Sequence, residues 1–307
     1  MKPRIAFALA LLGLAACGDA SATPTTRTYA SGIDDVAALA VDDDGGVWAA
    51  TASYEDDGTD ALYYVAAEGS APLEVLDDLH TALGLLWLDG ELYVASAGRV
   101  DAYSGFDGTS FASRRTVLEL PAGVGEVNGL AAGSDGRLYL GVSAPSDHDE
   151  TTIEESGTVL SFLPDGGDVQ VFASGIRAPV GLALDGDDLL VTMDQRDDLG
   201  DATPGDWLAV VHEGDDWGFP DVTTSLAPVA ELDAHGAVAG VAVADGFAYV
   251  AEWAAGEVDR VSLADGTVTE VDVDVANPVA LAFTAAGDLL VGDWSAGTIV
   301  VVPASQL

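Results

Sequence analysis

Two acidic segments contain side chains that could bind a metal ion or transfer a proton. The longer segment runs from Asp194 to Asp206 and includes Asp197, Asp198 and Asp201. Carboxylates are the hard oxygen ligands that Ca²⁺ prefers, so these three are candidate ligands of a structural calcium, although their spacing is not that of an EF-hand loop. The alternative is a solvent-exposed acidic loop, which is the usual meaning of such a run of charges.

Histidine is the side chain best suited to accept a proton near neutral pH. His148 lies in the second acidic segment, Asp147–Glu150, and His235 stands between an alanine and a glycine. Both are candidate general bases. The alternatives are that His148 belongs to an exposed acidic loop and that His235 binds a neighbouring backbone carbonyl.

A sequence repeat predicts the elements that position these residues. Each unit has an apolar segment rich in Gly, Leu and Ala, a short Asp/Gly turn and an alternating strand of the Leu-Tyr-Val type. Six copies occur: VAALAVDDDGGVWAAT from Val36, ALGLLWLDGELYVAS from Ala82, VNGLAAGSDGRLYLGVS from Val127, PVGLALDGDDLLVTM from Pro179, VAGVAVADGFAYVAE from Val238 and PVALAFTAAGDLLVGD from Pro278.

Most units continue into a second hairpin, so each repeat contains four short strands. Turns of the Asp-Gly type supply the positive φ that tight hairpins require, and four strands in about 40 to 45 residues are typical of a propeller blade. The sequence therefore predicts an all-β fold, a single six-bladed β-propeller with four-stranded antiparallel blades. The last unit is one strand short, and we expect residues 27–33 to supply that strand and close the ring.

In such a blade, the connections between the second and third strands lie on the same face as the connections between blades. Long loops on a rigid scaffold commonly carry function, so we expect the site on this face. Trp253 and Trp294 occupy equivalent places there in blades five and six, where they could stack on a ligand or pack along the rim. Three of the four histidines fall in these connections: His80, His148 and His235.

The block from Gly175 to Pro220 is more specific than the repeat. It contains GIRAPVGLAL, DQRDDLGDATPGDWL and DWGFP. These motifs resemble those of the soluble glucose/sorbosone dehydrogenase family, in which they read Gly-x-Arg-Asn-Pro-x-Gly-Leu-Ala-Phe, Arg-Asp-Asp-Leu-Gly-Asp, Asp-Glu-Leu-Asn and Tyr-Gly-Trp-Pro. The resemblance covers roughly residues 80 to 300. It implies a six-bladed propeller that uses pyrroloquinoline quinone and Ca²⁺.

The same resemblance implies roles for individual residues. Arg177 would contact the quinone, and a guanidinium suits that role because its planar donors match carboxylate oxygens bidentately. Backbone carbonyls near Gln195 and Arg196 would hold the catalytic calcium, and carbonyl ligation does not depend on the side chain. The implied substrate is a small sugar or an aldehyde.

The sequence also departs from the family's pattern. The family's catalytic histidine falls at Gly125, which cannot accept a proton. The asparagine after the arginine is Ala178, and the glutamate and asparagine of Asp-Glu-Leu-Asn are Trp207 and Ala209. Lys2 is the only lysine in the chain, so any lysine contact to the quinone is lost with the signal segment. The sequence thus predicts a degenerate active site in which the base is not assigned.

The N-terminus has the anatomy of a lipoprotein signal. Lys2 and Arg4 precede an uncharged apolar run that is shorter than the about 20 residues needed to span a bilayer, and Cys17 follows a Leu-Ala-Ala box. We expect export and lipid anchoring at the cell envelope, on the periplasmic or outer surface. The alternative is an ordinary cleaved signal with a chance cysteine. The expected parts are a signal peptide (1–16), a lipidated flexible tether (17–26) and the propeller (27–307).

Charge restricts the partners. The chain has 52 acidic and 10 basic residues, a formal net charge of −42. Nucleic acid is excluded as a natural partner because phosphate binding needs a basic surface, and anionic membranes would repel the protein, so we expect membrane contact only through the N-terminal lipid. The acidity indicates either capture of basic partners or, as we favour, a solvated coat. We expect a monomer.

Three functions fit the sequence. The first is a quinone-dependent sugar or aldehyde dehydrogenase with an altered site. The second is a non-catalytic propeller that binds a glycan, peptide or protein at the envelope. The third is a metal-dependent lactonase-like hydrolase, for which Glu126, Asn128 and Asp194 would have to converge on one ion.

Overall fold

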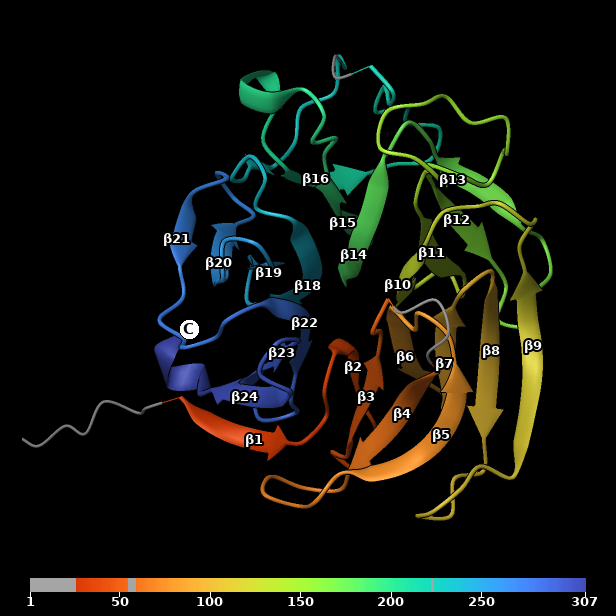
Figure 1. Cartoon of the computed structure of the whole chain (residues 1–307), viewed down its shortest axis with the longest axis vertical. Coiled ribbons are helices and arrows are strands. Elements are labelled where there is room, and N and C mark those ends of the chain that lie inside the picture. Colours follow the sequence, from red (N-terminus) through yellow and green to blue (C-terminus); the bar gives the residue numbers. More distant parts are fainter. Residues whose placement is uncertain (1–25, 55–58, 222–223) are drawn as a thin grey trace, which may run out of the picture.

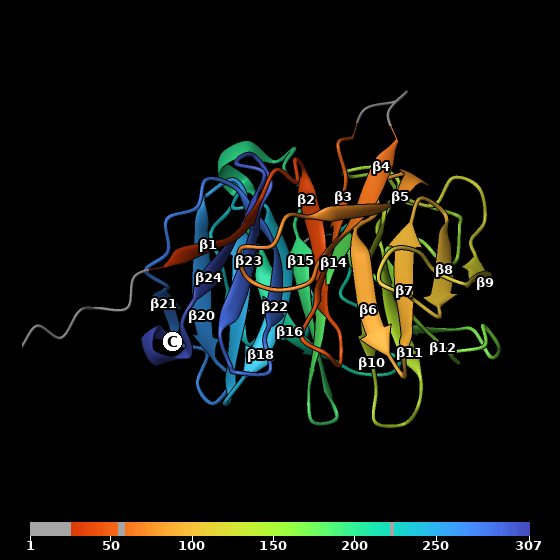
Figure 2. The same ribbon diagram turned by 90° about the horizontal axis from the view of Figure 1, so that it is seen from below.

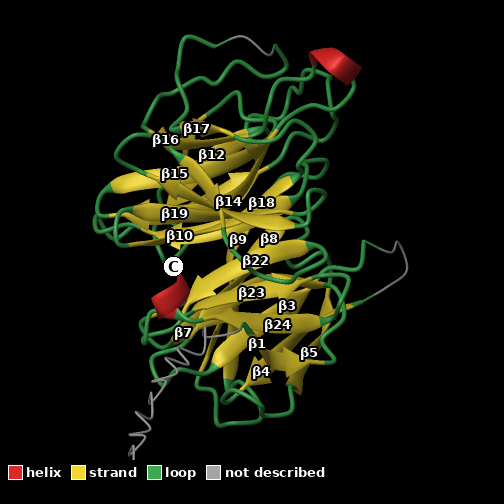
Figure 3. Ribbon diagram, turned by 90° about the vertical axis from the view of Figure 1, so that its left-hand side faces the viewer, coloured by secondary structure: helices red, strands yellow, loops and turns green. Residues whose placement is uncertain are grey.

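The computed structural model describes residues 26–54, 59–221 and 224–307, which form six four-stranded antiparallel sheets around a central axis (Figure 1). The predicted six-bladed, all-β propeller is confirmed. Apart from two short 3₁₀ helices, η1 (Gly200–Ala202) and η2 (Ala304–Gln306), these ranges contain no helix (Figure 3). Neither of these helices is long enough to cross a bilayer. The predicted signal peptide, Cys17 and all but the last residue of the tether lie outside the described residues.

Each blade runs from an inner strand at the axis to an outer strand at the rim. Blade one consists of β2 (Val36–Val41), β3 (Val47–Thr51), β4 (Asp60–Val65) and β5 (Leu73–Leu79). Blade two consists of β6 (Gly84–Leu88), β7 (Glu91–Ser96), β8 (Arg99–Ser104) and β9 (Ser113–Glu119). Blade three consists of β10 (Val127–Ala132), β11 (Leu138–Val142), β12 (Thr158–Phe162) and β13 (Gln170–Ala173).

The second half of the ring repeats this order. Blade four consists of β14 (Ala178–Asp185), β15 (Asp188–Asp194), β16 (Trp207–Val211) and β17 (Ala230–Glu231). Blade five consists of β18 (Val238–Ala244), β19 (Phe247–Glu252), β20 (Glu257–Ser262) and β21 (Val268–Glu270). Blade six consists of β22 (Pro278–Phe283), β23 (Leu289–Asp293), β24 (Thr298–Val302) and β1 (Arg27–Ser31).

The ring is closed by the N-terminal strand, as predicted from the short last repeat. Strand β1 pairs antiparallel with β24, with Arg27 opposite Val301 and Ser31 opposite Thr298. Figure 1 shows β1 along the outside of β24. Because β1 then leads directly into β2, the first and last blades are joined by one continuous segment and β24 has no free edge.

Small residues in the inner strands let the six blades converge. A Cβ atom added at Gly84 would lie 2.2 Å from the Asn128 carbonyl oxygen, and one added at Gly181 would lie 2.6 Å from that of Ala239. The Gly and Ala positions of the repeat are therefore set by the close approach of neighbouring backbones. Larger apolar side chains fill the space between adjacent blades, as in the cluster of Leu138, Leu160 and Phe162 between blades two and three.

Figure 2 shows the ring from its edge, with the strands running between two faces. The connections within blades between the second and third strands, and those from each blade to the next, share one face, which we call the mouth face. Buried aspartates fix these connections. Asp206, 1% exposed, accepts hydrogen bonds from the backbone nitrogens of Gln195 (2.8 Å) and Val238 (3.0 Å), and so joins a blade-four loop to blade five. Asp60 plays the same part between blades one and two.

Candidate functional site

The candidate site lies where the axial channel meets the mouth face. An axial cavity of about 380 Å³ reaches residues of the mouth-face connections, and a neighbouring cavity of about 790 Å³ extends over the loops of blades two and three. Both are lined by Glu126 and Asp194. The other polar and aromatic side chains in the axial cavity come from four different blades: Tyr54, Asn128, Trp253 and Trp294.

Arg177 joins Asp147 and Asp194, two of the polar residues of the site. It lies directly before β14, and its guanidinium forms ion pairs with Asp194 at 2.6 Å and with Asp147 at 2.9 Å. Its side chain is 21% exposed. The arginine expected to contact a quinone is therefore already paired with two carboxylates of the protein.

Two carboxyl groups near Arg177, those of Asp194 and Glu126, have raised pKa values. Burial, together with the nearby charge of Asp206, raises the pKa of Asp194 to about 7, although Arg177 opposes that shift. Glu126 is open to the cavities but enclosed by protein on other sides, and this desolvation raises its pKa as well. Near neutral pH, Asp194 can thus either donate or accept a hydrogen bond from a ligand.

Asn128 is a buried polar residue of the site. The residue is 1% exposed and its Nδ2 donates to the Ser143 hydroxyl at 2.8 Å. Its Oδ1 receives no hydrogen bond from the residues that the structure describes. A buried amide oxygen without a donor is costly, and Asn128 borders the axial cavity, although its Oδ1 atom is itself shielded.

The two predicted tryptophans stand together at the cavity. Their ring centroids are 6.2 Å apart at an interplanar angle of 74°, and the Trp294 indole nitrogen donates to the Ala52 carbonyl of blade one at 2.9 Å. Trp294 is thereby held in place, while Trp253 is 38% exposed. Trp217, by contrast, is buried against Trp207, with ring centroids 4.3 Å apart, and packs within the blade.

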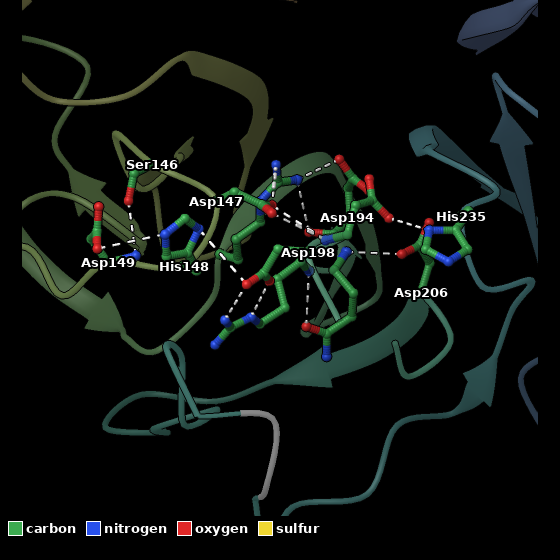
Figure 4. A network of polar contacts seen from close by, with 12 residues as sticks. Ser146, Asp147, His148, Asp149, Asp194, Asp198, Asp206 and His235 are labelled. Atoms are coloured by element: carbon green, nitrogen blue, oxygen red, sulfur yellow. Dashed lines mark hydrogen bonds and ion pairs between the residues drawn. The ribbon is translucent and has the colours of Figure 1, made fainter. Parts of the chain in front are cut away.

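The candidate histidine bases do not line either cavity. His235 binds the Asp197 carboxylate through Nδ1 at 2.5 Å, which raises the pKa of His235 (Figure 4). His148 is about half exposed and lies within 4 Å of Asp149 and Asp198. His80 contributes its carbonyl to a backbone hydrogen bond from Ala97.

The structure separates the three acids considered as ligands of a structural calcium. Asp197 is bound to His235, Asp201 is exposed in η1, and Asp198 forms a bidentate ion pair with Arg196 at 2.7 and 2.8 Å. Asp198 instead shares a group with Asp147 and His148, whose potential ligand atoms lie within 4.8 Å of one another.

The residues present do not fit a quinone that carries carboxylates. Arg177 is neutralised by two aspartates, and Glu126 adds a further carboxyl group beside the same space. Gln195 and Arg196 line neither cavity; the Arg196 side chain binds Asp198 and the Pro220 carbonyl. An anionic quinone would therefore meet net negative charge.

Gly125 has no room for the histidine that the resemblance places there. A Cβ atom at this position would lie 2.5 Å from the carbonyl oxygens of both Ser143 and Ala144. Any side chain would require the blade-three loop to move. The glycine is thus part of the local packing and not merely a lost functional group.

Two features were missed at the level of sequence. The contact of Asp147 with Arg177 joins loops of different blades, and no spacing pattern indicates it. A second acidic group, formed by Asp233, Glu252 and Glu257 of blade five, also went unnoticed. A signal for that group was present in the repeat, because Glu257 stands where blade two has Arg99.

Comparison with known proteins identifies the fold class. The PQQ-bound form of aldose sugar dehydrogenase from Streptomyces coelicolor superimposes with a TM-score of 0.72 at 21% identity, covering 90% of this chain and 95% of that one. A Trichoderma reesei protein of Carbohydrate-Active Enzymes Family AA12 gives 0.71 at 16% identity, covering 90% and 94%. The soluble aldose sugar dehydrogenase of Escherichia coli gives 0.68 at 15%, covering 90% and 98%.

The resemblance to soluble sugar dehydrogenases is thus confirmed as a shared fold. No protein-family model matches the sequence, and no curated protein matches it. At these identities, the function must be argued from the site.

Proposed function

We propose that this protein is an exported lipoprotein that binds a small polyhydroxylated molecule, a sugar or related aldehyde, at the mouth of its propeller. Catalysis with a bound quinone is reduced or lost in this proposal. The observation that carries it is the axial cavity itself, which is lined by Asn128, by Glu126 and Asp194, and by two tryptophans.

These groups match the chemistry of a sugar. Hydroxyl groups donate to amide and carboxylate oxygens, and the apolar faces of a pyranose pack against aromatic rings. The cavity of about 380 Å³ lies within the size range of small-molecule sites. A neutral ligand also avoids the repulsion that an anion would meet beside three carboxyl groups.

The loss of quinone chemistry rests on Gly125 and Arg177. The first cannot carry a base and has no space for one, and the second is occupied by Asp147 and Asp194. Export and anchoring rest on the signal anatomy before Cys17. Mass spectrometry of the N-terminal peptide tests the anchor, since a diacylglycerol on Cys17 is expected and an unmodified Cys17 would contradict it.

Ligand binding is tested by titrating the purified propeller with a panel of aldoses while following tryptophan fluorescence and heat release. We expect at least one saturable isotherm, weakened about 10-fold by Trp253→Ala because a stacking contact of about 1 kcal/mol or more is removed. His212→Ala, in a tight turn on the opposite face, is the matched control and should bind normally. Absence of any saturable aldose binding would contradict the proposal.

A second candidate is sugar oxidation with a quinone, which is favoured by the overlap with the PQQ-bound dehydrogenase. It would require Arg177 to release Asp147 and Asp194. Addition of the quinone, Ca²⁺, an aldose and a dye acceptor distinguishes the two functions. Dye reduction that disappears in Arg177→Ala would establish the second candidate, whereas aldose binding without dye reduction supports the first.

A further inference from the structure

We propose that blade five holds a Ca²⁺ ion between the carboxylates of Asp233, Glu252 and Glu257. Asp233 lies in the connection from blade four, Glu252 ends β19 and Glu257 begins β20. One potential ligand oxygen from each of these residues lies within 4.8 Å of the others. The group is distinct from the sugar site, and it shares no residue with the group of Asp147, His148 and Asp198.

Glu252 is the buried carboxylate of this group whose oxygens lack hydrogen-bond donors. It is completely buried, and neither of its carboxylate oxygens receives a hydrogen bond from an N–H or a hydroxyl group of any described residue, while the neighbouring Asp259 is a second carboxyl group. Gly236 packs so closely that a Cβ atom there would lie 2.2 Å from Oε2, with the Asp233 carbonyl also nearby. Burying a carboxylate without a donor or a counterion costs several kcal/mol, so Glu252 must take up either a proton or a cation.

Blade two shows how the same scaffold treats a buried carboxylate. The segments Gly98-Arg99-Val100-Asp101 and Gly256-Glu257-Val258-Asp259 occupy the same place, since β8 begins at Arg99 and β20 at Glu257. Asp101 is 2% exposed and is neutralised by Arg99 at 2.6 Å and by Arg114 at 2.8 Å.

In blade five, both arginines are replaced by acids or lost. Glu257 stands in place of Arg99 and lies opposite Glu252 on the neighbouring strand β19. Asp259 lies opposite Glu270 on β21. No ion pair among the described residues involves Asp233, Glu252, Glu257 or Asp259. Among the described residues, arginines therefore neutralise the buried carboxylate of blade two, whereas none forms an ion pair with the buried carboxylates of blade five.

Calcium is the cation that fits this donor set. All the available ligands are oxygens, and Ca²⁺ accepts irregular coordination by carboxylates, backbone carbonyls and water, whereas Mg²⁺ demands a near-ideal octahedron. The ion would tie the blade-four connection to blade five. That connection contains His235 and Ala237 at φ values of 64° and 53°, a conformation that favours glycine, so an added ligand there would offset local strain.

The competing explanation is a proton shared between Glu252 and Asp259. Burial, followed by the charge of Asp259, raises the pKa of Glu252 to about 8, so this carboxyl can remain protonated below that pH. A shared proton predicts no response to calcium. The two explanations are therefore best separated above pH 8, where the proton is lost.

The test is thermal unfolding of the full chain above pH 8, in EGTA and in CaCl₂, with ionic strength held constant by NaCl because a chain of net charge −42 is stabilised by any salt. We expect calcium at about 100 times its Kd to raise the Tm of the wild type by about 5 °C. Asp233→Asn and Glu252→Gln should abolish this rise. Asp198→Asn, in the other acidic group, should retain it.

Glu252→Gln also reports on folding, because it removes a buried charge and should melt no lower than the wild type in EGTA. Three outcomes overturn the proposal: no calcium response in the wild type, an equal response in all variants, or a response lost only in Asp198→Asn. None depends on aldose binding, so the calcium site and the sugar site can fail separately.

Discussion

Blades two and five lie on opposite sides of the ring (Figure 1) and place an aspartate at the same position of their third strand. In blade two, Asp101 is held by two arginines of the chain. In blade five, Asp259 and Glu252 are buried among further acids. Blade five has neither of these two arginines, and Glu257 reverses the charge of one of them, so its buried carboxyl groups form no ion pair with any described residue.

Arg99→Glu makes blade two resemble blade five, and it should have the largest effect. Asp101 would keep only Arg114, and breaking part of a buried ion pair should lower the free energy of unfolding by about 2 kcal/mol. Urea unfolding in EGTA measures this. The matched control is Arg115→Glu, whose partner Glu91 is more exposed. If both substitutions lower the free energy of unfolding equally, the burial of Asp101 does not explain the loss of stability.

Glu257→Arg is the reverse change and should have a smaller effect. The new guanidinium can pair with Asp259 and Glu252, which should stabilise the protein in EGTA by about 1 kcal/mol and abolish the calcium response. Thermal unfolding with and without calcium measures both. A variant that is less stable in EGTA, or that still responds to calcium, would break the analogy between the two blades.

The pH dependence of stability in EGTA tests whether Glu252 titrates as a buried carboxyl group. Glu252 has its pKa raised from 4.5 in the unfolded chain to about 8 in the fold, so the unfolded chain releases this proton first. Its contribution is complete below about pH 4.5 and is lost as pH rises through 8. The wild type should therefore lose stability over this range relative to Glu252→Gln. Parallel profiles would show that Glu252 does not titrate as described.

Much of the fold follows from the sequence because the repeat fixes both the blade and its small inner residues. The short last repeat even predicts closure by the N-terminal strand, which pairs with β24. The N-terminal signal and Cys17 remain predictions. For the site, the block around Arg177 predicts a position at the mouth-face end of blade four, and the structure places Arg177 directly before β14.

The rest of the site depends on contacts between blades that no spacing encodes. Asp147 reaches Arg177 from blade three, and the blade-three loop closes over Gly125. His148 and His235 remain candidate bases by their chemistry, but neither lines a cavity, and no spacing pattern indicates their contacts with Asp198 and Asp197. Alignment of the repeats by charge, and not only by hydrophobicity, would have revealed Glu257.

The most direct test is a crystal of the full propeller soaked with Tb³⁺, a substitute for Ca²⁺ that can be located by anomalous scattering. We expect an anomalous peak about 2.4 Å from carboxylate oxygens of Asp233, Glu252 and Glu257. A map with no peak there, and with the Glu252 carboxyl hydrogen-bonded to that of Asp259, would contradict it.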